Sequence, residues 1–413
     1  MINPVPALAF VGADPVRLPS LGRVLRDPLA CWPPSVLDRP LTEGRSGTRR
    51  VALLAEPRAV GEILLNRAGR FPRCRLHEKI LGAAYGEELA REDNPDWRRQ
   101  RREVAQPMSS ERAQALVPRI QLALDRSLAQ WEARPEREPL DVLFESRRLT
   151  LDVLWSAFFC DDEAARAREP LVEEAANALD RRPDLLDQLN DLEPLAAEAV
   201  RRQAFRRADI GAGEEVGIET IRLFLHVGHD NSAAALSWAL WLLALHPEWQ
   251  ERARAEWQDA DALTPVDNAA CPVTSAVLRE TLRLFPPILQ LSREVESEVE
   301  VAGERPAPGW TAIVNLYVLH RNRLLWPEPD SFDPSRFLEA GDEIRRRLLW
   351  LPFGTGPRGC IGAMFAQIEL TLALGRILSR FQLLPNPDEG LACRVDWALR
   401  PEGRRPLFIR RLD

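Results

Sequence analysis

The feature that most constrains the fold is residues 216–245, a helical pattern that becomes apolar on all faces. A helix of this kind is stable only when other elements surround it. Its most apolar part, residues 232–246, is shorter than the roughly 18 residues that a membrane-spanning helix needs. The sequence therefore predicts a buried helix through the middle of the protein and no membrane anchor.

Further helical patterns predict what surrounds this central helix. Apolar residues recur at spacings of three and four in residues 97–102, 110–133, 140–159 and 164–179. Most of these patterns are amphipathic, as expected for helices with one face on a core. A last strong helix is predicted over residues 361–381.

A small β region is predicted beside the helices. Residues 51–54 predict a strand that leads into a helix from Pro57, and the alternation in 295–301 and 311–314 predicts two strands joined by a turn. We expect a mainly α fold with a small β subdomain, formed as a single domain over all 413 residues without a fused reductase. The proline-rich residues 1–50 are expected to be irregular.

The charge balance excludes one class of partner. The chain has 55 basic and 62 acidic residues and a net charge of -7, which offers no footprint for a phosphate backbone, so no nucleic acid is expected. The N-terminus lacks the basic start and apolar run of a signal peptide. The six cysteines lie far apart without a C-x-x-C pair, and a reducing cytoplasm is the expected location.

A cysteine loop is the most informative short segment. Residues 353–362, FGTGPRGCIG, set Cys360 among four glycines just before the last predicted helix. Small residues let the backbone approach a flat ligand, and free N–H groups at a helix start favour an ionised sulfur, with Arg358 adding positive charge. An inert buried cysteine is one alternative. A dinucleotide site is another, because the glycines also spell G-x-G-x-x-G, but that motif needs a βαβ unit and one long helix follows here.

This loop resembles the signature of the cytochrome P450 family, F-x-x-G-x-R-x-C-x-G. The matching residues are Phe353, Gly356, Arg358, Cys360 and Gly362. The resemblance implies a soluble, bacterial-type cytochrome P450 with haem b between the central helix and the loop. It also implies that Cys360 is the iron ligand and that Phe353 lies beside the cofactor.

Two further motifs carry the same resemblance. Glu280 and Arg283 match the family's E-x-x-R, and on a helix they share a face and can pair. Arg336 resembles the third member of the family's structural Glu–Arg–Arg triad. We expect these three residues to be scaffold, with Glu280 and Arg283 partly buried.

The resemblance implies cations for the two haem propionates, because the planar fork of arginine suits carboxylates. The candidates are Arg101, which with Trp97 matches W-x-x-x-R, then Arg293, which follows the E-x-x-R motif, and Arg358. The competing interpretation is that residues 97–102, WRRQRR, form a solvated basic helix face. The other arginines of this segment are expected to face solvent and to dock an acidic electron donor.

On the central helix, the segment VGHDNS lies where the family has A/G-G-x-D/E-T-T beside the iron. Gly228 and Asp230 match, and the resemblance implies that the acid and the next residue deliver protons to oxygen. Asn231 occupies the threonine position, and Val227 replaces a small residue. An amide cannot pass on a hydroxyl proton, so Ser232 or water would compensate. The alternative is that Asn231 only faces a neighbouring helix.

The leading function is O2- and electron-dependent monooxygenation of a small to medium hydrophobic molecule, in secondary metabolism. By analogy, the residues that line its pocket are Phe224, Val227, Leu289 and Leu291. Separate ferredoxin and ferredoxin reductase proteins would supply electrons to a monomer. Asn231 leaves open an isomerase, dehydratase or peroxygenase that acts on a pre-oxidised substrate, and a haem-binding sensor is a third alternative. Residues 160–215 are short for the family's substrate lid.

Overall fold

The computed structural model describes most of the chain. The described residues are 16–17, 32–46, 49–66, 69–74, 101, 105, 108–135, 138–159, 174–175, 177–178, 192–201, 218–258, 270–296, 298–300, 303, 308–338, 347–387, 392–395, 398–402 and 406–412. Trp97 and most of residues 160–215 lie outside them. The predictions for Trp97 and for the lid therefore stay predictions.

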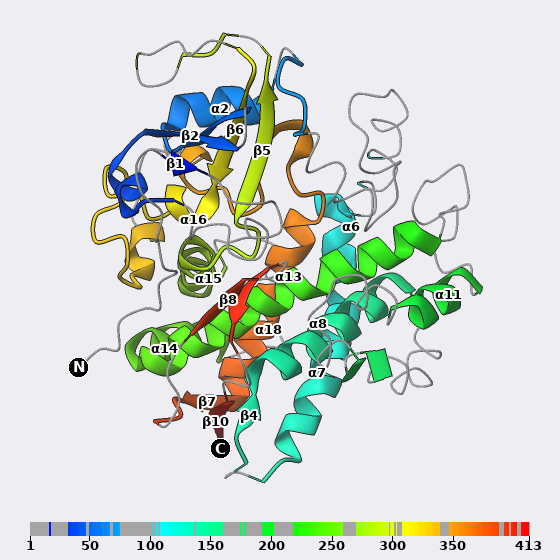
Figure 1. The fold of residues 1–413 in the computed structure, drawn as a ribbon. Helices are drawn as coiled ribbons and strands as arrows, with labels where there is room; N and C mark the ends of the chain where they lie inside the picture. The colour runs from blue at the N-terminus through cyan, green and yellow to red at the C-terminus, as the bar shows by residue number, and fades with distance from the viewer. Residues whose placement is uncertain are drawn as a thin grey trace.

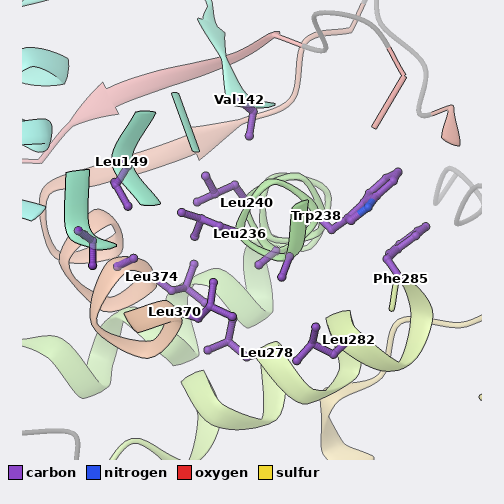
Figure 2. Packing of buried hydrophobic residues seen from close by; sticks show 14 of the residues in the cluster. Val142, Leu149, Leu236, Trp238, Leu240, Leu278, Leu282, Phe285, Leu370 and Leu374 are labelled. Atoms are coloured by element: carbon purple, nitrogen blue, oxygen red, sulfur yellow. The ribbon is translucent and has the colours of Figure 1, made fainter. Parts of the chain in front are cut away.

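The central element is helix α13, Ile218–Leu245, which runs diagonally through the middle of the molecule (Figure 1). The helices that pack against it include α8 (Val142–Phe159), α15 (Pro272–Leu284) and α18 (Ala363–Arg380). Figure 2 shows leucines of these helices around Leu236 and Leu240 of α13, which are both 0% exposed. The prediction of a buried central helix is confirmed. Among the described residues, no helix has both the length and the apolarity needed to cross a membrane.

The remaining helices are shorter. They are α2 (Pro57–Leu65), α6 (Ser110–Ala115), α7 (Val117–Glu132), α11 (Glu193–Arg201), α14 (Pro247–Arg254) and α16 (Leu316–Leu319), with the 3-10 turns η1 (Pro34–Asp38), η3 (Ala255–Trp257), η4 (Pro334–Phe337) and η5 (Gly356–Arg358). The prediction of one helix over residues 110–133 is wrong, because α6 ends at Ala115 and α7 begins at Val117. Pro118 lacks the N–H that would bond to the preceding turn, so a new helix starts there.

The main sheet has five strands in the order β1-β2-β3-β6-β5 and lies to one side of α13 (Figure 1). Its strands are β1 (Val16–Arg17), β2 (Leu41–Ser46), β3 (Arg49–Leu54), β5 (Gln290–Val295) and β6 (Trp310–Asn315). β3 and β6 are parallel, whereas β5 and β6 are antiparallel, as are β2 and β3. Two smaller sheets contain β4 (Leu140–Asp141), β7 (Phe381–Leu384) and β10 (Pro406–Arg411), and β8 (Cys393–Val395) and β9 (Leu399–Pro401).

The strand predictions hold only in part. The strand and helix expected from residue 51 onward are confirmed in β3 and α2, but β2 makes the prediction of irregular structure wrong for residues 41–46. The strand expected at 295–301 is also wrong, because β5 ends at Val295. Buried polar residues in β5, among them Ser292 and Glu294, hide this strand from a search for alternating apolar residues. The mainly α fold with a small β part is confirmed.

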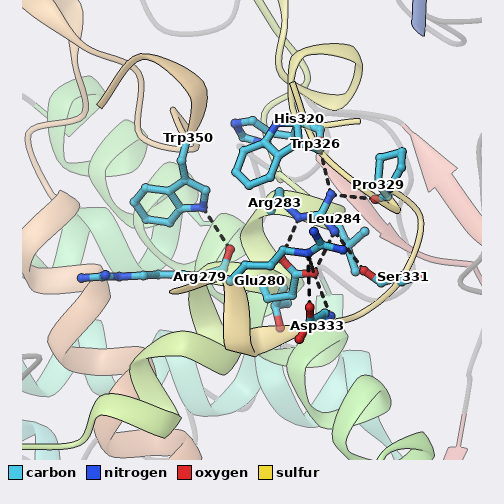
Figure 3. Close-up of polar contacts among 12 residues, drawn as sticks. Arg279, Glu280, Arg283, Leu284, His320, Trp326, Pro329, Ser331, Asp333 and Trp350 are labelled. Atoms are coloured by element: carbon cyan, nitrogen blue, oxygen red, sulfur yellow. Dashed lines mark hydrogen bonds and ion pairs between the residues drawn. The ribbon is translucent and has the colours of Figure 1, made fainter. Parts of the chain in front are cut away.

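A buried charged cluster ties α15 to the loop that leads into η4 (Figure 3). The Glu280 carboxylate accepts hydrogen bonds from Arg283 at 2.6 Å and 2.7 Å, and from the Asp333 backbone N–H at 2.9 Å. Arg336 Nε lies 3.4 Å from Glu280 Oε1. Glu280 and Arg283 are both 0% exposed, which exceeds the partial burial expected. The predicted pairing is confirmed, and it fixes the loop before η4 to the core.

We expect Glu280→Gln to lower the free energy of unfolding by about 3–5 kcal/mol, because the substitution leaves Arg283 as a buried charge without its carboxylate. Urea unfolding followed by far-ultraviolet circular dichroism measures this difference. The control is Glu43→Gln, because Glu43 pairs with Arg50 at the exposed surface. Loss of this surface ion pair should lower the free energy of unfolding by about 1 kcal/mol or less. Equal effects of the two substitutions would contradict the scaffold role of the buried pair.

A second prediction concerns acid stability through His320. This residue is 0% exposed and its Nε2 accepts the Leu351 N–H at 3.0 Å. Burial, together with Arg283 and Arg321, lowers the pKa of His320 from 6.5 to about 3. The unfolded chain binds a proton here below about pH 6.5 and the folded chain does not, so stability present at pH 7 is lost as the pH falls towards 3.

We expect His320→Gln to remove about 1.4 kcal/mol per pH unit from the slope of unfolding free energy between pH 6 and pH 4. The glutamine side-chain oxygen can still accept the Leu351 N–H. Urea unfolding at several pH values gives the slope for both proteins. An identical slope in the variant would show that His320 does not stay neutral in the folded chain.

Candidate functional site

The cysteine loop is held in a tight conformation against α2. The Cys360 N–H donates to the Phe353 carbonyl at 2.8 Å, and the Gly359 N–H donates to the Gly356 carbonyl at 3.0 Å. Gly356 has φ +75, and a Cβ there would lie 2.2 Å from the carbonyl oxygen of Leu64. Glycine is therefore required at this position both by the left-handed backbone and by the close approach of α2.

Cys360 is exposed to solvent, although burial still acts on its thiol. Burial raises the pKa of this thiol, whereas the Gly362 N–H, which donates to the sulfur, and the positive charge of Arg101 both lower it. The loop precedes α18, so the N–H of Gly362 has no helical partner and points to the sulfur. The N–H donor expected at the helix start is thus present, and the charge that acts on the sulfur comes from Arg101.

Arginines from separate parts of the chain converge on the loop. Arg101 Nη2 donates to the carbonyl of Gly359, directly beside the cysteine. Arg293 lies in β5 on the same strand face as Leu291, which contacts the loop at Gly354. Arg101, Arg293 and Arg358, which lies in the turn η5, are thus all found at the cysteine loop. Their role in binding propionates stays a prediction.

One further arginine at this place was missed by sequence reasoning. Arg73 forms an isolated antiparallel bridge with Arg293, and its charge lowers the pKa of Arg101, for which burial is the largest cause. The sequence around Arg73 contains no motif, and its partner strand lies more than 200 residues away in sequence, so no local pattern could identify it. Several like charges in one partly buried region indicate an anionic ligand.

The acid predicted on α13 is held by two arginines from other elements. Asp230 Oδ1 accepts hydrogen bonds from Arg147 of α8 at 3.1 Å and 3.0 Å and lies 3.4 Å from Nη1 of Arg400. Burial acts most strongly and in the opposite direction, but the charges of Arg147, His226 and His229, with the hydrogen bond from Arg147, together lower the pKa of Asp230. The carboxyl is consequently an anion at neutral pH, and its predicted catalytic role stays a prediction.

Asn231 and Gly228 occupy different surroundings on the same helix. Asn231 Nδ2 donates to the carbonyl of Val227 at 3.1 Å, one turn earlier. A Cβ at Gly228 would lie 2.9 Å from a methyl group of Leu154, so this glycine lets α8 approach α13 closely. Cofactor contact by Gly228 stays a prediction, whereas its packing against α8 is observed. The helix is continuous through this segment.

Two apolar side chains near the site are exposed although most of their neighbours are buried. Val227 of α13 is 41% exposed, and Ile288, just before β5, is 38% exposed. Of the residues predicted to line a pocket, Leu289 is only 6% exposed and belongs to the core, and Phe224 packs on Phe158 with ring centroids 5.1 Å apart.

The donor set of this site fits haem. An exposed thiol has an N–H donor on its sulfur, and arginines lie around its loop. A macrocycle with one axial thiolate and two carboxylates matches both features. The exposed apolar side chains of Val227 and Ile288 would lose their contact with water if a flat apolar group covered them.

Comparison with known proteins agrees with this fit. A family model described as cytochrome P450 matches residues 40–210 and 212–403. The chain is 34% identical to cytochrome P450 4X1 of Rattus norvegicus over 248 residues, which are 56% of this chain and 48% of that protein. It is 37% identical to cytochrome P450 4F8 of Homo sapiens over 188 residues, 43% of this chain and 36% of that protein. The chain thus spans about half the length, or less, of these curated relatives.

A solved structure shows the same fold. The crystal structure of the cytochrome P450DA heme domain superposes with a TM-score of 0.74 at 24% identity, and the match covers 90% of this chain and 89% of that one. Because the family model matches most of the sequence and the fold agrees, the chain belongs to the cytochrome P450 family of haem proteins.

Proposed function

We propose that this chain is a haem-thiolate monooxygenase that binds haem b through Cys360 and oxidises a small to medium hydrophobic molecule with dioxygen. The observation that carries the proposal is the exposed Cys360 thiol, which has the Gly362 N–H on its sulfur and the charge of Arg101 nearby. Haem bound through a thiolate supplies activation of dioxygen, with electron density from the sulfur favouring O–O cleavage.

The residues of the chain would divide the work of holding the cofactor. Arg101, Arg293 and Arg358 are proposed to bind the propionates, and Arg73 adds a fourth positive charge. The Gly362 N–H donates to the sulfur and favours its ionised form, against the effect of burial. Phe353 fixes the loop, since its carbonyl accepts the Cys360 N–H.

A hydrophobic substrate is supported by apolar and aromatic side chains of α13, α8 and the segment before β5. Val227 and Ile288 are exposed apolar residues, and Phe224 belongs to an aromatic group with Phe158 and Phe159. Such surfaces bind apolar molecules by excluding water. Separate ferredoxin and ferredoxin reductase donors, a substrate from secondary metabolism, a monomeric state and a cytoplasmic location stay predictions from the sequence.

A second candidate function is an isomerase, dehydratase or peroxygenase that acts on an already oxidised substrate. The observation that favours it is the pair of residues at the oxygen site. Asn231 carries no hydroxyl, and Asp230 is held as an anion by Arg147 and Arg400. Such an enzyme would need neither an external electron donor nor a proton from Asp230.

We expect Cys360→Ala to abolish the thiolate-type spectrum of the reduced carbon monoxide complex, because no sulfur would remain to bind iron. Haem content and carbon monoxide difference spectra of the purified protein measure this. The matched control is Cys393→Ala, which removes a thiol in β8 and should leave the spectrum unchanged. A thiolate spectrum that survives in the Cys360 variant would overturn the proposed ligand.

Asn231→Thr distinguishes the two candidate functions. For a monooxygenase, we expect the amount of product formed per NAD(P)H consumed to rise in the variant. The increase should be smaller than the factor of about 100 that a positioned proton donor contributes to a rate. Product yield, NAD(P)H consumption and hydrogen peroxide release are measured with a ferredoxin and its reductase. If neither the wild type nor the variant turns over with electron donors, while both convert a hydroperoxide, the second candidate replaces the first.

A further inference from the structure

Asn231 is a polar residue on the side of α13 that α8 does not cover. Val227 and Asn231 lie four residues apart, so they share a face of the helix, and both are accessible to solvent. A residue two positions away points to nearly the opposite side of a helix. His229 holds that position. It is 1% exposed, and its carbonyl accepts the Thr150 hydroxyl of α8 at 3.1 Å. The Asn231 side chain therefore points away from α8.

The hydrogen bond of the Asn231 side chain fixes which end of its amide faces the accessible side. Asn231 Nδ2 donates to the carbonyl of Val227 at 3.1 Å. A carbonyl oxygen can only accept a hydrogen bond, so the amide nitrogen must face the helix backbone and Oδ1 must face away from it. Among the described residues, no group donates to this Oδ1. The helix thus presents a hydrogen-bond acceptor on its accessible side.

The same side of α13 leads to the segment that carries Ile288. Trp238 lies seven residues after Asn231, on the same side of the helix, and its ring stacks on Phe285 with centroids 3.9 Å apart (Figure 2). Ile288 follows Phe285 by three residues and is 38% exposed. The exposed Val227 lies one turn before Asn231. The amide oxygen therefore lies on a face whose exposed neighbours along the chain are apolar.

A ligand that covers this face removes water from the amide oxygen. If the ligand offers only carbon and hydrogen there, the oxygen loses its hydrogen bond to water and gains none in return, which weakens binding. A hydroxyl group on the ligand restores the bond. A site of this kind rejects an analogue that lacks the hydroxyl more strongly than it rejects one of a slightly different size. The neighbouring Asp230 does not compete for the hydroxyl, because it is 5% exposed and faces Arg147 of α8.

We infer that Asn231 is a specificity residue whose Oδ1 accepts a hydrogen bond from a hydroxyl group of the substrate. This inference rests on the proposed monooxygenase function and narrows its substrate class to uncharged, largely apolar molecules that carry a hydroxyl group. The apolar part of such a molecule covers Val227 and Ile288, which are exposed. The hydroxyl group fixes the orientation of the molecule on α13. An amide suits this binding role, since it accepts a hydrogen bond without taking part in proton transfer.

The first test is equilibrium binding of three matched probes to the holoenzyme, which needs no turnover. The probes are methylcyclohexane, cyclohexanol and cyclohexanone, which share a ring and carry a methyl, a hydroxyl or a carbonyl group. Calorimetry and the haem absorption spectrum give the Kd of each probe. Asn231→Leu replaces the amide by an apolar side chain of similar size. We expect the ratio of the methylcyclohexane Kd to the cyclohexanol Kd to fall about tenfold in this variant.

Cyclohexanone tests which atom of the amide is used. It has no hydrogen to donate to Oδ1, so its Kd relative to methylcyclohexane should change little in Asn231→Leu. An equal fall for ketone and alcohol would show that the amide N–H binds the ligand and would overturn the assignment to Oδ1. An unchanged ratio for cyclohexanol would overturn the inference as a whole. Leucine has a higher helix propensity than asparagine, so the variant should keep α13 intact, which far-ultraviolet circular dichroism checks.

The matched control is Val227→Ala, one turn earlier on the same face. It removes apolar surface and no polar group, so the affinities for all three probes should change together and their ratios should stay as in the wild type. A similar fall of the cyclohexanol ratio in both variants would contradict a specific role for Asn231. The carbon monoxide spectrum separates the two levels of failure. A missing thiolate spectrum in the wild type sinks the proposed function, whereas an intact spectrum with unaltered ratios in Asn231→Leu sinks only the recognition of a hydroxyl group.

Discussion

The burial of the C-terminal half of α13 is the constraint on which the rest of the structure depends. Residues 232–245 of this helix are almost entirely apolar and must be covered by other elements, and α8, α15 and α18 pack on α13. Each fully buried leucine at these contacts stabilises the fold by about 1.5–3 kcal/mol. Gly228 lets α8 come close, because any Cβ there would contact Leu154. The polar residues of α13 are thereby fixed relative to the cysteine loop at the start of α18.

A helix buried in this way must also neutralise the polar residues that it carries. The structure uses two different solutions at adjacent positions. Asp230 is ionised between guanidinium groups, whereas burial keeps His229 neutral by lowering its pKa to about 4. Of these two residues, only Asp230 therefore carries a charge at neutral pH.

The sequence predicted those parts of the fold whose signal is local. The all-round apolar pattern identified α13, and five fixed positions identified the cysteine loop. β5 was misplaced because Ser292, Arg293 and Glu294 are buried polar residues, and burial depends on which elements cover the strand. Site residues that depend on contacts between distant segments were also missed. Arg73 is fixed by its bridge to Arg293, and no spacing in the sequence relates these two residues.

The glycines of the cysteine loop show why a motif needs its structural context. Gly354, Gly356 and Gly359 fit a dinucleotide-binding pattern as well as they fit the cytochrome P450 signature. A dinucleotide site needs a strand directly before the glycines, yet residues 347–349 before this loop are helical. At Gly356 the absent side chain accommodates the carbonyl of Leu64, a position already filled by protein where a phosphate would have to lie. The same residue type therefore serves here to seat the loop that carries Cys360 against α2.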